Sequence, residues 1–228
     1  MPTKEMPNAR GHVYLCSKSI ETMIDEHSFE YEILEEEDGS TLCVESIPWR
    51  GLADELAELH YLHGAQFIRQ LKLIIEYGEF HLVAGETDIF STGGENSEDY
   101  PNLLNAAQKA VEHGYRVYIL PNPKGFRTAD FIFERKGVYK MFDLKTIIGR
   151  NSIDNRLSES IGQTNRVLLN MAVEYTPSAL ARSIKHFFES NPQAIEVLVF
   201  KGKKQLSVTR KSLEDNRFFQ TFIRRYTK

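Results

Sequence analysis

The stretch Thr128-Ala-Asp-Phe-Ile-Phe-Glu-Arg-Lys-Gly-Val-Tyr-Lys-Met-Phe-Asp-Leu-Lys-Thr146 predicts a β-hairpin, because two apolar runs flank a short polar segment. A turn on Lys136-Gly137, or on the four residues centred there, gives one register in both cases. That register places Asp130 directly opposite Asp143. Since strand side chains alternate between faces, Lys145 shares the face of Asp143. The sequence therefore predicts two carboxylates and one ammonium group on a single patch.

This trio suits the hydrolysis of phosphodiester bonds. Carboxylate oxygens are preferred ligands of hard divalent cations such as Mg²⁺ or Mn²⁺, which keep bound water and accept substrate phosphate oxygens. We predict that Asp130 and Asp143 hold the metal, and that Lys145 acts on the attacking water and offsets charge growing at phosphorus. A plainer alternative stays open: the first Asp is a turn cap, and Asp-x-Lys is a solvated ion pair.

The elements around the hairpin follow a recognisable order. A helix ends at His113-Gly114-Tyr115 and a strand follows; after the hairpin come a helix that holds Ser158-Glu-Ser-Ile-Gly-Gln-Thr-Asn165 and an apolar strand from Val167. With the Asp…Asp-x-Lys set, this order resembles the PD-(D/E)xK nuclease superfamily. Within that superfamily, these elements look like the nuclease toxins at the C-termini of contact-dependent growth inhibition proteins. The resemblance covers roughly residues 100–210.

The resemblance implies a restriction-endonuclease-like α/β fold, in which helices flank a central mixed sheet. It also implies a catalytic role for Gln163, cleavage of tRNA, other RNA or DNA, and a cognate inhibitor protein. The chain departs from the family at Ala129, where proline is usual, and in lacking a clear acid on the preceding helix. Glu98, ahead of the helix that starts at Tyr100, is the candidate third metal ligand, although the helix dipole alone favours acids there.

The charge of the chain is divided unevenly along its length. Residues 1–100 carry 6 Lys and Arg against 21 Asp and Glu, whereas residues 101–228 carry 22 against 11. A basic half suits a polyanionic partner, because binding phosphates releases counterions. The predicted nucleic-acid contacts are Arg127, Thr146, Arg156, Lys203 and Lys204. Solvated surface positions are the alternative for these side chains.

The composition also suggests how the chain is divided. We predict an acidic α+β region of unknown role over residues 1–90 and the nuclease domain over residues 91–228. Within the first region, two helical patterns are separated by Gly64. His60 and His63 have the spacing of a metal pair, but no third ligand is evident nearby, so a structural or solvated role is favoured.

Membrane and secretory functions are not expected. No apolar run approaches the ~20 residues that span a bilayer, and residues 1–8 lack the apolar core of a signal peptide. These features predict a cytoplasmic protein. Its two cysteines, Cys16 and Cys43, lack the spacing of zinc ligands and are expected to be reduced, buried thiols.

Three interpretations remain open from the sequence. The leading one is a magnesium-dependent endonuclease. The second is a non-catalytic nucleic-acid-binding or assembly protein of a phage or mobile element, which keeps the nuclease scaffold. The third is a two-part toxin whose acidic portion covers its basic portion. Metal binding and cleavage distinguish the first interpretation from the second.

Overall fold

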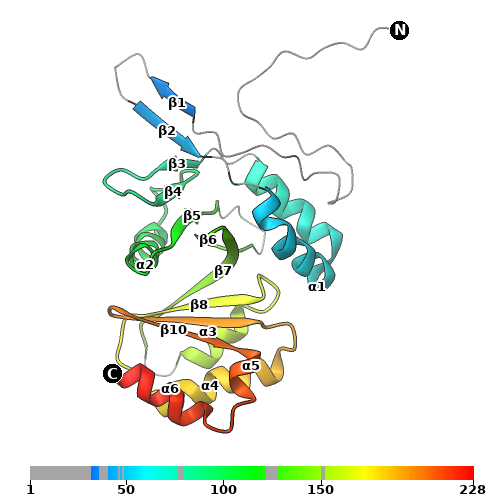
Figure 1. The fold of residues 1–228 in the computed structure, drawn as a ribbon, viewed down its shortest axis with the longest axis vertical. Coiled ribbons are helices and arrows are strands. Elements are labelled where there is room, and N and C mark those ends of the chain that lie inside the picture. Colours follow the sequence, from blue (N-terminus) through cyan, green and yellow to red (C-terminus); the bar gives the residue numbers. More distant parts are fainter. Residues whose placement is uncertain are drawn as a thin grey trace.

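A computed structural model describes residues 32–35, 41–45, 47, 49–76, 80–121, 128–149 and 152–228. The described residues form one mixed sheet of ten strands, whose order in the sheet follows the sequence (Figure 1). The strands are β1 Glu32–Glu35, β2 Thr41–Glu45, β3 Phe80–Leu82, β4 Ile89–Ser91, β5 Arg116–Ile119, β6 Phe131–Arg135, β7 Val138–Ile147, β8 Arg166–Met171, β9 Glu196–Lys201 and β10 Lys204–Thr209. The helices are α1 Trp49–Glu76, α2 Tyr100–Glu112, α3 Ile153–Glu159, α4 Pro177–Ser190, α5 Arg210–Leu213 and α6 Phe218–Thr227. The predicted fold class, a mixed sheet flanked by helices, is confirmed.

Strands β6 and β7 form the predicted hairpin in the predicted register. Phe131 pairs with Phe142, and the pairing continues without a slip to the turn. Lys136 and Gly137 both have positive φ, 56° and 76°, which is the type I′ geometry that matches the twist of a two-residue hairpin. Before the strand begins, the Asp130 backbone N–H donates to the Phe142 carbonyl at 2.9 Å. Because Phe142 accepts this bond and Asp143 does not, regular pairing ends at Phe131, and Asp130 lies one step out of the predicted register instead of directly opposite Asp143.

Strand β7 changes its partner halfway along. Its first half pairs antiparallel with β6, and its second half, which starts at Asp143, pairs in parallel with β8. Helix α1 packs beside the first half, which β8 does not reach: the Met141 backbone N–H donates to Glu55 of α1 at 3.3 Å. Gly51 of α1 lies against the Tyr139 ring, where a Cβ atom would overlap the ring.

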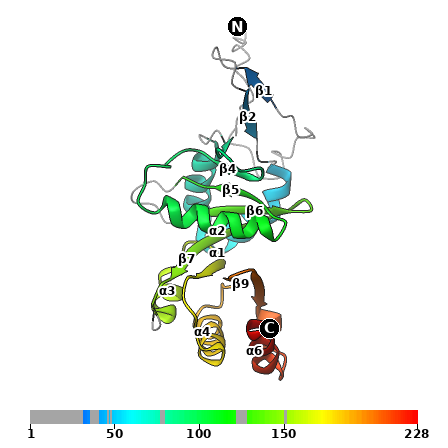
Figure 2. The same ribbon diagram turned by 90° about the vertical axis from the view of Figure 1, so that its left-hand side faces the viewer.

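The helices cover the two faces of the sheet in separate groups (Figures 1 and 2). Phe142, at an even position of β7, packs in the core under α2. Met141 and Ile147, at odd positions, face the other way: Met141 packs in the core under α1, and Ile147 in the core under α3, α4 and α6. Asp143 and Lys145 occupy the odd positions between these two cores.

Two further expectations concern the first part of the chain. Gly64 interrupts α1 with a non-helical backbone (φ 83°, ψ 172°), as predicted, and this region of φ favours glycine. The predicted boundary at residues 90 and 91 falls inside β4, which pairs with both β3 and β5. The division into two domains stays a prediction. In the described part of the chain, no helix has the length and apolar character to cross a membrane.

Buried ion pairs attach α1 to the sheet. One nitrogen of the Arg166 guanidinium, NH1, lies 2.6 and 2.8 Å from the two carboxylate oxygens of Glu55. The Nε of Arg166 lies 3.4 Å from Glu196 Oε2, and Lys140 Nζ lies 2.8 Å from that same oxygen. Burial raises the pKa of Glu55 to about 7, with Arg166 opposing the shift. The network thus joins α1 to β7, β8 and β9.

We expect Glu55→Ala to lower the free energy of unfolding by about 3 kcal/mol, because it removes a partner from a buried arginine. Urea unfolding measures the loss. Glu58→Ala is the matched control, since the Glu58 carboxylate is 41% exposed and lies 3.9 Å from the same guanidinium. That change should cost less than about 1 kcal/mol. Equal losses from the two variants would contradict the assignment.

Candidate active site

The structure brings Asp130, Asp143 and Lys145 together. The Nζ atom of Lys145 lies 2.8 Å from Oδ1 and 2.8 Å from Oδ2 of Asp143. The side chain of Asp143 is 1% exposed and that of Lys145 is 11% exposed. The Leu144 backbone N–H donates to Asp130 Oδ2 at 2.6 Å, which holds the Asp130 carboxyl over β7. A solvated pair on an exposed face, the plainer alternative, does not describe this buried arrangement.

The two carboxyl groups perturb each other. Burial and, after it, the Asp130 carboxylate raise the pKa of Asp143 to about 7, against the opposing effect of Lys145. Burial also raises the pKa of Asp130, against the Leu144 N–H and Lys145. One ammonium group balances only one of two ionised carboxylates, so full ionisation leaves a buried negative charge. A proton or a cation relieves that imbalance.

The donor set fits a hard divalent cation. Asp143 Oδ2 is buried and lies 2.8 Å from Lys145 Nζ without a well-aligned hydrogen bond, so it keeps a lone pair for a further ligand. Mg²⁺ is commonly held by one or two carboxylates and completes its shell with water and phosphate oxygens. Within the described ranges, no group of three or more His, Cys, Asp or Glu side chains is placed to hold a metal ion. The protein ligands offered are therefore Asp130 and Asp143.

The acid predicted as a third ligand does not join this group. Glu98 is exposed in the loop before α2. The next residue in this loop, Asp99, carries a negative charge that raises the pKa of Asp130. Asp99 directly precedes α2 and makes no side-chain cap. Within the described residues, neither Glu98 nor Asp99 completes a group of three side chains that could hold a metal ion.

Gln163 and Arg156 do not contact the carboxylates. Helix α3 ends at Glu159 rather than continuing through Gln163, because the chain turns there and reaches Gly162 with φ 84°. The Gln163 amide donates to the Glu159 carbonyl at 3.0 Å. Arg156 pairs with the Glu159 carboxylate at 2.9 Å on the exposed surface of α3. A catalytic role for Gln163 would require its amide to leave the Glu159 carbonyl.

The remaining predicted nucleic-acid contacts are dispersed. Thr146 lies on the face of β7 opposite Asp143 and Lys145, and pairs there with Asn170, whose side chain contacts α2. Lys203 is exposed in the β9–β10 turn. Lys204 donates to the carbonyl oxygens of Tyr226 and Thr227 at the end of α6. Arg127 lies outside the described residues.

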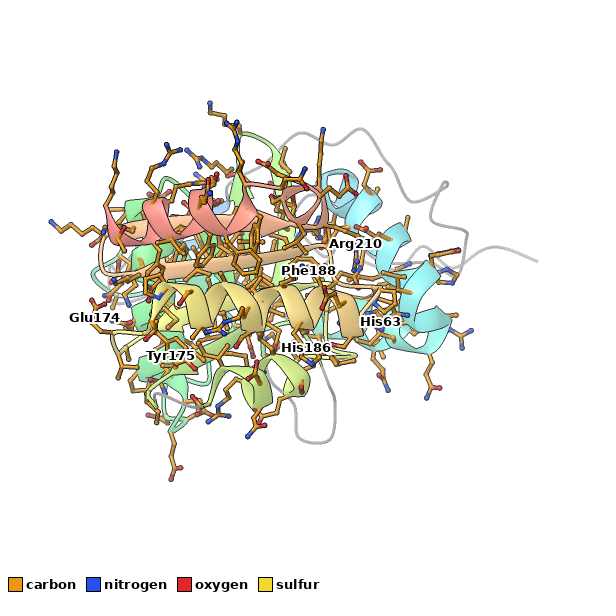
Figure 3. The ribbon with its side chains drawn as sticks, turned by 90° about the horizontal axis from the view of Figure 1, so that it is seen from below. His63, Glu174, Tyr175, His186, Phe188 and Arg210 are labelled. Carbon is orange, nitrogen blue, oxygen red and sulfur yellow. The ribbon has the colours of Figure 1, made fainter. Side chains whose placement is uncertain are left out.

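Helix α1 supplies residues that the sequence did not connect with this region. Asn165, just before β8, is buried, and its side chain lies on the same face of the sheet as that of Asp143 on the neighbouring strand β7. The Asn165 Oδ1 atom lies 3.2 Å from His63 Nε2, and its Nδ2 atom has no hydrogen-bond partner. Figure 3 shows His63 on α1, near one end of α4. Burial lowers the pKa of His63. This contact fits the structural role favoured for His63.

Comparison with known proteins adds one likeness. No family model and no curated protein sequence matches the chain. A solved structure, the CdiA-CT/CdiI toxin and immunity complex from Burkholderia pseudomallei, is similar to part of it, with 17% sequence identity and a TM-score of 0.37. The alignment covers 56% of this chain and 93% of the other.

We expect Asp143→Asn to stabilise the protein at pH 8, in the presence of a chelator. The folded protein raises the pKa of the Asp143 carboxyl to about 7. The contribution of this carboxyl to the free energy of unfolding is therefore fully present below its pKa in the unfolded chain, and it is lost as pH rises through about 7. The variant avoids that loss. Its advantage over the wild type should be on the order of 1 to 2 kcal/mol at pH 8 and should shrink at pH 5.

Thermal unfolding at the two pH values measures the effect. Asp154→Asn, at an exposed position of α3, is the control and should show no such dependence. A variant that is less stable than the wild type at pH 8 would refute the charge imbalance.

Proposed function

We propose that this protein is a metal-dependent phosphodiesterase that cleaves nucleic acid. The observation that carries the proposal is the convergence of Asp130, Asp143 and Lys145 in one buried patch of the sheet. A surface ion pair would leave these groups hydrated. Instead, burial gives this site unbalanced negative charge and a directed lysine, which is the arrangement that phosphoryl chemistry uses.

Each residue has a distinct task in this proposal. Asp130 and Asp143 hold a divalent cation, Mg²⁺ or Mn²⁺, which when bound activates water and neutralises phosphate charge. The Leu144 N–H fixes the orientation of Asp130 before any ligand arrives. Lys145 lies beside Asp143 and can turn its remaining N–H donors toward a phosphate oxygen or the attacking water. Positioning and electrostatics therefore supply the catalysis.

The proposed substrate is nucleic acid because residues 101–228, which contain the site, carry 22 Lys and Arg against 11 Asp and Glu. RNA, and tRNA in particular, is the proposed preference, with DNA as the alternative. A toxin-like role and a cognate inhibitor protein belong to the same proposal. These finer points are supported by the resemblance of the hairpin and its flanking elements to the contact-dependent nuclease toxins.

Cleavage is tested by incubating the purified protein with total RNA and with plasmid DNA, with magnesium or with a chelator. We expect cleavage in magnesium alone. Asp143→Ala and Lys145→Ala should each lower the rate by at least about 100-fold, since each removes a group that acts on the reacting atoms. Asp154→Ala should retain the wild-type rate. Cleavage that survives both site variants would end the proposal.

Calorimetry with Mg²⁺ tests the metal separately. Because the carboxylates must be deprotonated to bind a cation, affinity should increase as pH rises through about 7, the raised pKa of Asp143. Asp143→Asn should abolish the binding that depends on this site. A chain that binds nucleic acid but neither binds metal nor cleaves would instead be the non-catalytic binding or assembly protein.

A further inference from the structure

A second candidate site lies at the last strand of the sheet. A pocket of about 310 Å³ opens between β10, α5 and α6. Its apolar lining includes Val208 and Phe222, both buried in the core that α6 shares with the sheet. Lys211, Arg225 and Thr221 also line it. The pocket thus combines an apolar floor with two cationic side chains.

The cationic groups of Lys211 and Arg225 are not engaged by carboxylates among the described residues. Lys211 and Arg225 are both exposed, and neither forms an ion pair with a carboxylate in the part of the chain that the structure describes. The neighbouring Arg210 differs, since it lies over the Phe188 ring and binds backbone carbonyl oxygens after α4 (Figure 3). Lys211 and Arg225 therefore keep their donors available to a ligand.

One acid also lines the pocket. Asp215 Oδ1 accepts the Arg217 backbone N–H at 2.8 Å, ahead of α6. The charged lining is therefore two cations against one carboxylate, a net of one positive charge. The second oxygen of Asp215 can accept a hydrogen bond from a ligand hydroxyl or amino group. A ligand that fits this lining has an anionic end, an apolar part and hydrogen-bond donors.

We propose that this pocket binds a nucleoside monophosphate unit, either free or within a single strand of nucleic acid. The phosphate pairs with Lys211 and Arg225 through charge-assisted hydrogen bonds. The base packs against the apolar side chains of the pocket floor, because burial removes its ring surface from water. The volume is at the low end of the range for small-molecule pockets and suits one nucleotide.

This inference does not depend on the proposed phosphodiesterase. Strand β10 is separated from β7 by β8 and β9. At the usual spacing between strands, the two lie roughly 14 Å apart. The pocket is therefore distinct from the carboxylates, and binding there can be measured in a variant that cannot cleave.

The experiment is calorimetry of the full chain, in chelator and at low salt. The probes are the four nucleoside monophosphates, adenosine, inorganic phosphate and a single-stranded RNA hexamer. We expect at least one monophosphate to bind at least about 10-fold more tightly than phosphate or adenosine. Lys211→Ala and Arg225→Ala should each weaken it by about 10-fold or more, the value of one charge-assisted hydrogen bond. Thr221→Trp should block binding by filling the pocket.

Arg224→Ala is the matched control, because Arg224 neighbours Arg225 on α6, is exposed and does not line the pocket. It should leave binding unchanged, and thermal unfolding should show that all variants fold. If the pocket variants also weaken binding of the hexamer, the ligand is a single strand of nucleic acid. If only the monophosphate binds, the ligand is a free nucleotide. Phosphate that binds as well as the nucleotides, an equal loss in Arg224→Ala, or no binding overturns the proposal. Asp143→Asn should bind normally even if it no longer cleaves.

Discussion

A buried carboxyl group, Asp143, and a half-buried one, Asp130, share the ammonium group of Lys145, and the chemistry of this region depends on that arrangement. Burial alone would drive Asp130 and Asp143 toward their protonated forms, and their proximity strengthens that tendency. The single positive charge of Lys145 opposes this protonation, but it balances only one of the two carboxylates. A fold that keeps this arrangement gives up stability near neutral pH, which is common where side chains are positioned for function rather than for packing.

The geometry of that site follows from a single strand. Strand β7 pairs with β6 along one half and with β8 along the other, so Asp143 stands where the sheet changes from antiparallel to parallel pairing. On its own face, the core under α1 ends before Asp143 and the core under α3 and α4 begins after Lys145. The polar patch thus lies between two hydrophobic cores, with Asp143 buried and with Asp130 and Lys145 half-buried.

The sequence predicted the parts of this site that local rules determine. The hairpin register followed from two apolar runs and from Lys136-Gly137, a turn that fits only one pairing. The end of α3 was missed because Gly162 was read as lying within the helix, although glycine favours termination there. The ion pair between Arg166 and Glu55 was also missed, since nothing local marks a contact between residues 111 positions apart. Sequence patterns thus predicted the hairpin and the helical region of α1, while the contacts that attach α1 to the sheet became evident only in three dimensions.

Helix α1 has one more effect on the sheet. Next to the first half of β7 it occupies the place that another strand would take, and its Glu55 carboxylate satisfies the Met141 N–H. An unpaired strand edge is a template for aggregation, because its free backbone groups pair with extended segments of other molecules. Removing residues 49–76 would therefore open this edge of β7, next to Asp143 and Lys145, to pairing with an extended segment of another molecule.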